Sequence, residues 1–283
     1  MIRIDTHQHF WRYNAAEYGW LDESMRELRR DFLPGDLHAE LHGAGVDASI
    51  AVQTRQTLDE TRWLLDLADD HLFVAGVIGW VDLQADDVEA QLALVAANPK
   101  LIGIRHVVQS EPDDRFLLRP SFCRGVAVLA QFNLTYDILI YPRHLPVAAE
   151  FVAKFPDQWF VLDHLAKPPI RAGAIDEWAR DLRALAQCPR VWCKLSGLVT
   201  EADWQGWTPA QLHPYLDVAF DCFGPDRLVA GSDWPVCTVA ADYSRTMAVV
   251  SDYLERRPAA EREAVLGGNA RQFWGLESLV SSR

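Results

Sequence analysis

The chain has 283 residues, of which 49% are hydrophobic and 24% charged, a composition typical of a soluble globular protein. Its formal net charge of -13 argues against nucleic acid or an anionic membrane as a partner, because both would be repelled. The five cysteines show no C-x-x-C spacing, which favours reduced thiols. The sequence shows no signal peptide and no apolar run long enough to span a membrane, so we expect a cytoplasmic location.

Short runs rich in Val, Ile and Leu predict strands that are covered on both faces, as parallel strands are. They lie at Ile2–Phe10, Ala48–Thr54, Phe73–Val81, Leu101–Val107, Thr135–Tyr141, Trp159–Leu165, Val191–Gly197 and Leu228–Asp233. Segments with helical periodicity separate them, at Asp59–Asp70, Asp86–Asn98, Ser121–Phe132, Leu145–Phe155, Ile175–Gln187, Pro209–Phe223 and Tyr243–Arg256.

This alternation predicts one α/β domain over residues 1–283, a (β/α)8 barrel. A doubly wound open sheet is the alternative, but the first strand ends in His-Gln-His-Phe-Trp, without the glycine-rich turn of that fold. The longest irregular stretch, about Trp11–Gly35, follows the first strand and is rich in aromatic residues. It is a candidate lid over the barrel mouth, or else a surface loop whose aromatic side chains pack locally.

His7 and His9 are two positions apart at the carboxyl end of the first strand, so both should face the barrel mouth. Asp233 ends the eighth predicted strand, which neighbours the first when a barrel closes. His164 ends the sixth and should also point into the mouth, whereas Asp163 should point away. This set suits the binding of a divalent metal or an anionic oxygen. Alternatively, the histidines only make hydrogen bonds within the protein, and Asp233 caps a turn.

Other residues near strand ends are candidates for binding substrate. They are Trp11, Gln53, Arg55, Trp80, Arg105, Tyr141 and Lys194. Arg105 or Lys194 would stabilise an oxyanion or a carboxylate, or would instead form internal salt bridges. The tryptophans would stack on a sugar or pack in the core. No Gly-x-Ser-x-Gly elbow for a serine nucleophile is present.

The His7-x-His9 pair, His164, the Gly-Ser-Asp-Trp-Pro around Asp233 and the closing segment 268–276 resemble the amidohydrolase superfamily. More narrowly, nearly the whole chain resembles its sugar-acid lactonases and 2-pyrone-4,6-dicarboxylate lactonase. The resemblance implies that the substrate is a small lactone, such as L-fucono- or L-rhamnono-lactone. Asp233 would act as general base on the attacking water, and His7, His9 and His164, or a metal that they hold, would polarise the carbonyl.

The chain departs from the two-metal pattern of this superfamily. Its fourth strand ends in Gly103-Ile104-Arg105-His106, without the bridging Lys or Glu, and its fifth carries no histidine. We therefore expect at most one ion, such as Zn²⁺, on His7, His9 and Asp233, and activity without metal is a second option. The alternative functions are a metal-dependent decarboxylase or hydratase with an acidic substrate, and a binding protein without catalysis.

Overall fold

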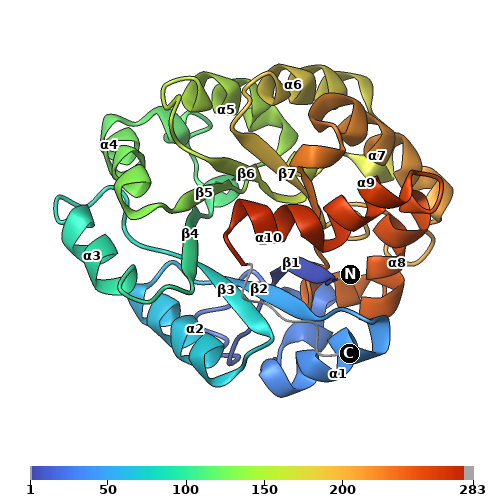
Figure 1. Ribbon diagram of the computed structural model, residues 1–283, viewed down its shortest axis with the longest axis horizontal. Coiled ribbons are helices and arrows are strands. Elements are labelled where there is room, and N and C mark those ends of the chain that lie inside the picture. The colour runs from blue at the N-terminus through green and yellow to red at the C-terminus, as the bar shows by residue number, and fades with distance from the viewer. Residues whose placement is uncertain (1, 277–283) are drawn as a thin grey trace.

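The computed structural model describes residues 2–276 and confirms the predicted (β/α)8 barrel (Figure 1). All eight strands pair in parallel in chain order. They are β1 (Ile4–Gln8), β2 (Ala48–Val52), β3 (Val74–Gly79), β4 (Leu101–His106), β5 (Thr135–Ile138), β6 (Phe160–Leu162), β7 (Val191–Leu195) and β8 (Leu228–Ala230). Residues 1 and 277–283, which the single-domain prediction also covers, lie outside the described residues.

Helices surround the sheet (Figure 1). They are α1 (Pro34–Ala44), α2 (Leu58–Asp70), α3 (Val88–Val95), α4 (Pro120–Leu129), α5 (Leu145–Val152), α6 (Asp176–Ala186), α7 (Pro209–Phe223), α8 (Tyr243–Leu254), α9 (Ala259–Glu263) and α10 (Asn269–Phe273). Thr57 caps α2 by accepting from the Glu60 backbone N–H, and Asp242 caps α8 in the same way. Between residues 2 and 276, no helix combines the length and the apolar character that crossing a membrane requires.

Helix α10 closes the amino-terminal end of the barrel, where it lies across the strands in Figure 1. Ala270 and Leu276 pack there against apolar side chains of the strands, including Ile4 and Ile102. Gly267 allows the close approach, because a Cβ at this position would lie 2.1 Å from the backbone oxygen of Ile2. The opposite end of the barrel therefore remains for a functional site.

The strands end earlier than predicted at that opposite end. β6 ends at Leu162 and β8 at Ala230, so His164 and Asp233 lie in the following turns and not in strands. Both residues have positive φ angles, 51° and 60°, which interrupt the extended backbone. The mouth is closed between β1 and β8 by backbone hydrogen bonds from Asp233 to His7 and from His9 to Trp234.

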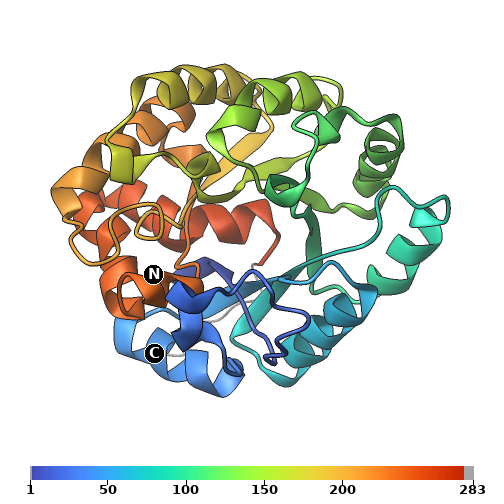
Figure 2. The same ribbon diagram turned by 180° about the vertical axis from the view of Figure 1, so that it is seen from behind.

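The long segment between β1 and α1 lies on this face, in dark blue in Figure 2. Trp11 and Phe32 pair through two backbone hydrogen bonds, of 3.0 and 2.9 Å, and join the two ends of the segment. Trp11 and Tyr18 are buried and pack against each other, as the local-packing alternative predicts. Trp20 and Met25 border the cavity described below, and closure of the segment as a lid stays a prediction.

Candidate active site

A cavity of about 410 Å³ opens at the carboxyl ends of the strands. Its walls combine residues from the long first loop with residues that follow β2, β4, β5, β6, β7 and β8. They are His9, Trp20, Met25, Thr54, Arg105, Val107, Gln109, Ser110, Leu139, Tyr141, His164, Lys167, Thr200, Glu201, Trp204, Asp233 and Val236. Substrate-binding loops of (β/α)8 enzymes occupy this face, so the cavity is the candidate active site.

Three imidazoles surround one carboxylate at the base of the cavity. The Oδ1 atom of Asp233 lies 3.3 Å from His9 Nε2 and 3.8 Å from both His7 Nε2 and His164 Nε2. The Nε2 atoms of His7 and His9 are 3.2 Å apart. The structure thus brings together the four residues that the sequence singled out, from three parts of the barrel.

The hydrogen-bond partner of His9 determines which of its nitrogens carries the proton. His9 Nδ1 lies 2.7 Å from the backbone oxygen of Val52, which only accepts, so His9 Nε2 presents a lone pair. His7 Nε2 lies 3.2 Å from both His9 Nε2 and Arg105 Nη1. Two imidazole nitrogens and a carboxylate converge, a donor set that fits one divalent cation.

His164 belongs to the same set, because ligand atoms of His7, His164 and Asp233 all lie within 4.8 Å of one another. The residues present therefore fit an ion on His7, His9 and Asp233 with His164 beside it. Arg105 already donates to His7 Nε2, so an ion bound to His7 would have to replace this hydrogen bond.

Burial and mutual contact set the charges of this cluster. Burial lowers the pKa of His164 to about 4 and lowers the pKa of His7 well below its ordinary value. Burial by itself would raise the pKa of Asp233, but the facing imidazoles, His164 foremost, hold it below its ordinary value. At neutral pH the site therefore presents an ionised carboxylate beside neutral imidazoles of His7 and His164.

A layer of buried charges lies below His7. Arg105 Nη1 is 2.9 Å from Asp163 Oδ2, and Lys194 Nζ contacts Asp137 and lies 3.0 Å from Asp163 Oδ1. Lys194 Nζ is also 3.3 Å from His7 Nδ1, and its side chain is fully buried and does not line the cavity. Each of these charges has an opposite partner, which buried charges require.

The prediction that Asp163 points away from the site is wrong, because Asp163 Oδ1 lies 3.4 Å from His7 Nδ1. The prediction assumed that a strand continues through His164, with side chains alternating between two faces. The backbone instead turns left-handed after Asp163, so the two neighbouring side chains reach the same cluster.

Three of the residues predicted to bind substrate border the cavity, namely His9, Arg105 and Tyr141, and His7 lies directly beneath it. Besides Lys194, four others do not border it: Trp11, Gln53, Arg55 and Trp80. Gln53 is buried and donates to the backbone of β4, and Arg55 forms ion pairs of 2.5 and 2.8 Å with two glutamates. Trp80 Nε1 lies 3.4 Å from His106 Nδ1, and Trp11 packs within the first loop.

Sequence reasoning missed several residues of the cavity wall, notably Lys167, Glu201 and Trp204. They lie in segments that follow β6 and β7. Their only signal was this position after strands, which many surface residues share. The conformation of each loop determines which of its side chains face the cavity.

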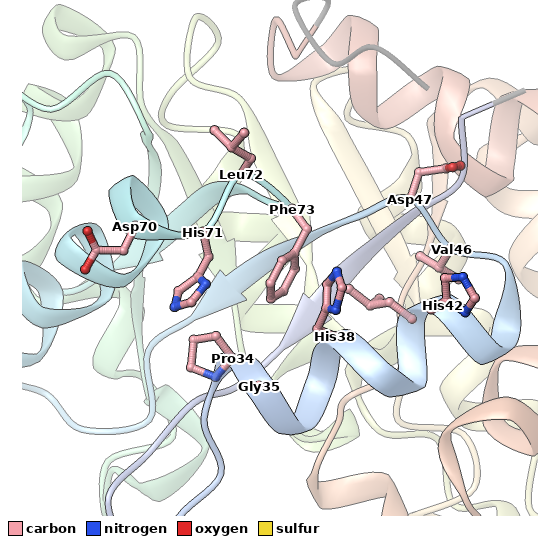
Figure 3. Close-up of a pocket in the computed structure, with 11 residues that line it drawn as sticks. Pro34, Gly35, His38, His42, Val46, Asp47, Asp70, His71, Leu72 and Phe73 are labelled. Atoms are coloured by element: carbon pink, nitrogen blue, oxygen red, sulfur yellow. The ribbon is translucent and has the colours of Figure 1, made fainter. Parts of the chain in front are cut away.

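A larger hollow of about 670 Å³ lies beside the amino-terminal ends of β2 and β3 (Figure 3). Histidines border it, but His38 and His71 each pack against Phe73, with ring centroids 5.1 and 5.8 Å apart. Within residues 2–276, the metal-type ligands with converging atoms are those of the smaller cavity, namely His7, His9, His164 and Asp233. The chemistry therefore belongs to the smaller cavity at the other end.

The sequence matches the profile of a family described as Amidohydrolase over residues 4–276. A Burkholderia multivorans protein named L-fucono-1,5-lactonase is 44% identical, in an alignment that covers 100% of this chain and 99% of that protein. A Burkholderia ambifaria protein of the same name is 39% identical, with 98% and 96% covered. A crystal structure of a Burkholderia multivorans amidohydrolase with bound Zn matches with a TM-score of 0.94 and 44% identity, over 97% of this chain and 99% of that chain.

Proposed function

The chain belongs to the amidohydrolase family, and from this premise we propose that it is a lactonase that hydrolyses a small sugar-acid lactone, such as an L-fucono- or L-rhamnono-lactone. One observation carries the proposal, namely an ionised Asp233 faced by three imidazoles in a cavity of about 410 Å³. This volume lies within the range of small-molecule sites. The names of the two Burkholderia relatives support the substrate class.

In the proposed reaction, Asp233 accepts a proton from the water whose oxygen attacks the lactone carbonyl. The bond between the carbonyl carbon and the ring oxygen then breaks. The ring oxygen leaves as an alkoxide and takes the proton from Asp233, so the product is the open hydroxy acid. Asp233 thus serves first as base and then as acid, and is regenerated.

His164 is positioned to stabilise the oxyanion that forms during the attack. It borders the cavity and lies beside Asp233. His164 Nδ1 is 2.8 Å from Ser196 Oγ, and a hydroxyl that donates to Nδ1 leaves the Nε2 proton for the substrate. Donors held in place before the reaction stabilise developing charge most effectively.

We propose His7, His9 and Asp233 as the residues that would hold one divalent ion, such as Zn²⁺. When bound, such an ion would polarise the carbonyl oxygen and activate water. The proton transfer at Asp233 and the hydrogen bond that His164 donates do not depend on it. We therefore propose that metal is not required for turnover.

The decarboxylase or hydratase alternative requires cations that are free to bind the carboxylates of an acidic substrate. Arg105 and Lys194 are paired with buried aspartates, and Arg55 is paired with Glu60 and Glu17. Lys167 also borders the cavity, but the Glu201 carboxylate 3.9 Å away offsets its charge. A neutral, polyhydroxylated lactone needs no free cation, so the pairing favours the lactone.

The proposal is tested with a panel of aldonolactones, with and without a metal chelator. We expect Asp233→Asn to lower kcat by about 10²- to 10⁴-fold, since an amide cannot accept the proton, while exposed Asp157→Asn serves as a control. Undiminished turnover by Asp233→Asn would exclude its role as base. If the unaltered protein hydrolysed no lactone of the panel, even with added Zn²⁺, the proposed function would be wrong.

A further inference from the structure

The turn after β6 has an unusual backbone. Four consecutive residues other than glycine, His164 to Lys167, have φ angles between 51° and 58°. A left-handed backbone is unfavourable for any residue that has a side chain. Such strain persists only where the surrounding structure holds it, and it is concentrated at functional sites.

The neighbouring elements hold this turn in place. Trp178 of α6 donates from Nε1 to the backbone oxygen of Leu165 at 2.8 Å, and the Lys167 N–H donates to the His164 oxygen at 2.7 Å. Gly197 provides the room, because a Cβ there would lie 2.7 Å from His164 Nδ1. The surrounding packing thus selects one conformation of the turn.

The consequence of this conformation is that His164 and Lys167 both border the cavity. The Lys167 ammonium lies 5.5 Å from the centre of the Tyr141 ring. Among residues 2–276 its one ion-pair partner is Glu201, with Nζ and Oε1 3.9 Å apart, too far for a hydrogen bond. Glu201 is held nearby through its backbone oxygen, which accepts from the Arg171 N–H at 3.0 Å.

This loose pair differs from the other charges of the site. Arg105 and Lys194 are buried and already contact carboxylates, whereas the side chains of Lys167 and Glu201 are 19% and 24% exposed and face the cavity. An ammonium only donates hydrogen bonds, an ionised carboxylate only accepts them, and a hydroxyl does both. A substrate hydroxyl can therefore bridge the two groups, which contact each other too weakly to exclude it.

We propose that Lys167 and Glu201 bind hydroxyl groups of the substrate and so determine specificity for polyhydroxylated lactones, an inference that rests on the proposed lactonase function. The pair lies in the same cavity as Trp20 and Trp204, whose rings supply apolar surface for a sugar face. Lys167 and Glu201 share this cavity with His164 and Asp233, which act at the carbonyl.

The test is the kinetics of Lys167→Met and Glu201→Gln with the best lactone of the panel. We expect each variant to raise KM about 10- to 100-fold, as loss of a hydrogen bond to a charged group does, with kcat within about threefold. The exposed Lys154→Met is the matched control and should behave as the unaltered protein. The affinity of the same lactone, measured by calorimetry in the Asp233→Asn background, should fall by the same factor.

Other outcomes overturn the inference in distinguishable ways. A fall in kcat at unchanged KM and affinity would place these groups at the reacting atoms, and unchanged kinetics would show that they do not touch the substrate. If Lys167→Met failed to fold because it disturbs the turn, Glu201→Gln would decide alone. Lack of lactone hydrolysis by the unaltered protein would instead contradict the proposed function.

Discussion

At the scale of single residues, burial determines the protonation states on which the chemistry depends. His164 sits against Asp233 and Ser196 with almost no solvent contact, and its pKa is lowered to about 4. The imidazole is therefore neutral throughout the physiological range, unlike an exposed histidine near its ordinary pKa of 6.5. The carboxylate beside it stays ionised over the same range.

This predicts a flat pH dependence down to unusually acidic conditions. In chelator-treated protein, kcat/KM should be constant from about pH 6 to 8. It should fall as the pH drops through about 4, because His164 then gains a proton and its charge weakens the neighbouring Asp233 as a base. Initial rates on an aldonolactone, corrected for spontaneous hydrolysis, measure this profile. An inflection near 6.5 would show that an imidazole with an ordinary pKa controls the reaction.

Acid unfolding must be separated from this effect. The folded pKa of His164 lies below 6.5, so the unfolded chain binds this proton more readily between pH 6.5 and 4. The contribution of the neutral imidazole to stability is full above pH 6.5 and decreases by about 3 kcal/mol as the pH falls to 4. A circular dichroism spectrum at pH 4 that matches the spectrum at pH 7 shows that the protein is still folded and identifies the catalytic titration.

At the scale of elements, the turn after β6 and the start of the loop after β7 form one unit. Gly197 has a φ of +65°, and its missing side chain leaves the space that the His164 ring fills. Ser196, one position earlier, hydrogen-bonds to the same ring. The position of His164 therefore depends on a residue of the neighbouring strand connection.

Gly197→Ala should reduce activity by about 10- to 100-fold, because the new Cβ would lie 2.7–2.9 Å from His164 atoms and must displace the ring. It should also destabilise the fold by roughly 1–2 kcal/mol through its left-handed backbone. Gly173→Ala is the matched control, since Gly173 has a φ of +63° but no atom within 4 Å of the added Cβ. Steady-state kinetics and thermal unfolding of both variants give the comparison, and equal activity in the two would refute the role of the contact.

At the scale of the whole molecule, closing the barrel between β1 and β8 requires more than strand pairing. The eight strands form a continuous sheet from β1 to β8, and a single bridge, from Gln8 to Trp234, joins its two edges. Buried Asp5 completes the connection. It accepts from the backbone N–H groups of His7 and Ser232, from Ser232 Oγ at 2.6 Å and from the Tyr243 hydroxyl.

Asp5→Ala should lower the free energy of unfolding by about 3 kcal/mol or more, because it leaves several buried donors without an acceptor. For a chain of this size the melting temperature should fall by roughly 6–12 °C. Asp5→Asn keeps one acceptor oxygen and should lose less. A melting temperature within about 2 °C of the unaltered protein for Asp5→Ala would show that this carboxylate does not hold the seam.

The period of hydrophobic residues and the order of elements were enough to predict the barrel and all eight strands. His7, His9, His164 and Asp233 lie together as predicted, because the carboxyl ends of parallel strands meet at one end of the barrel. The orientation of Asp163 was predicted wrongly, since a left-handed turn is invisible in a pattern of strand residues. Lys167 and Glu201 were missed for the same reason, because loop geometry alone turns them inward.

The sequence by itself determined the barrel, its family and the strand-end cluster, because apolar periodicity and short motifs are local properties of the chain. Only the tertiary structure decided which charges are available to a substrate. Lys194 and Arg55 form internal ion pairs. Lys167 borders the cavity, and its ion-pair partner among residues 2–276 is Glu201, 3.9 Å away. Pairing and burial depend on contacts between residues far apart in sequence. The sequence alone therefore could not show which charges beside the His7, His9 and Asp233 cluster are free to contact a substrate.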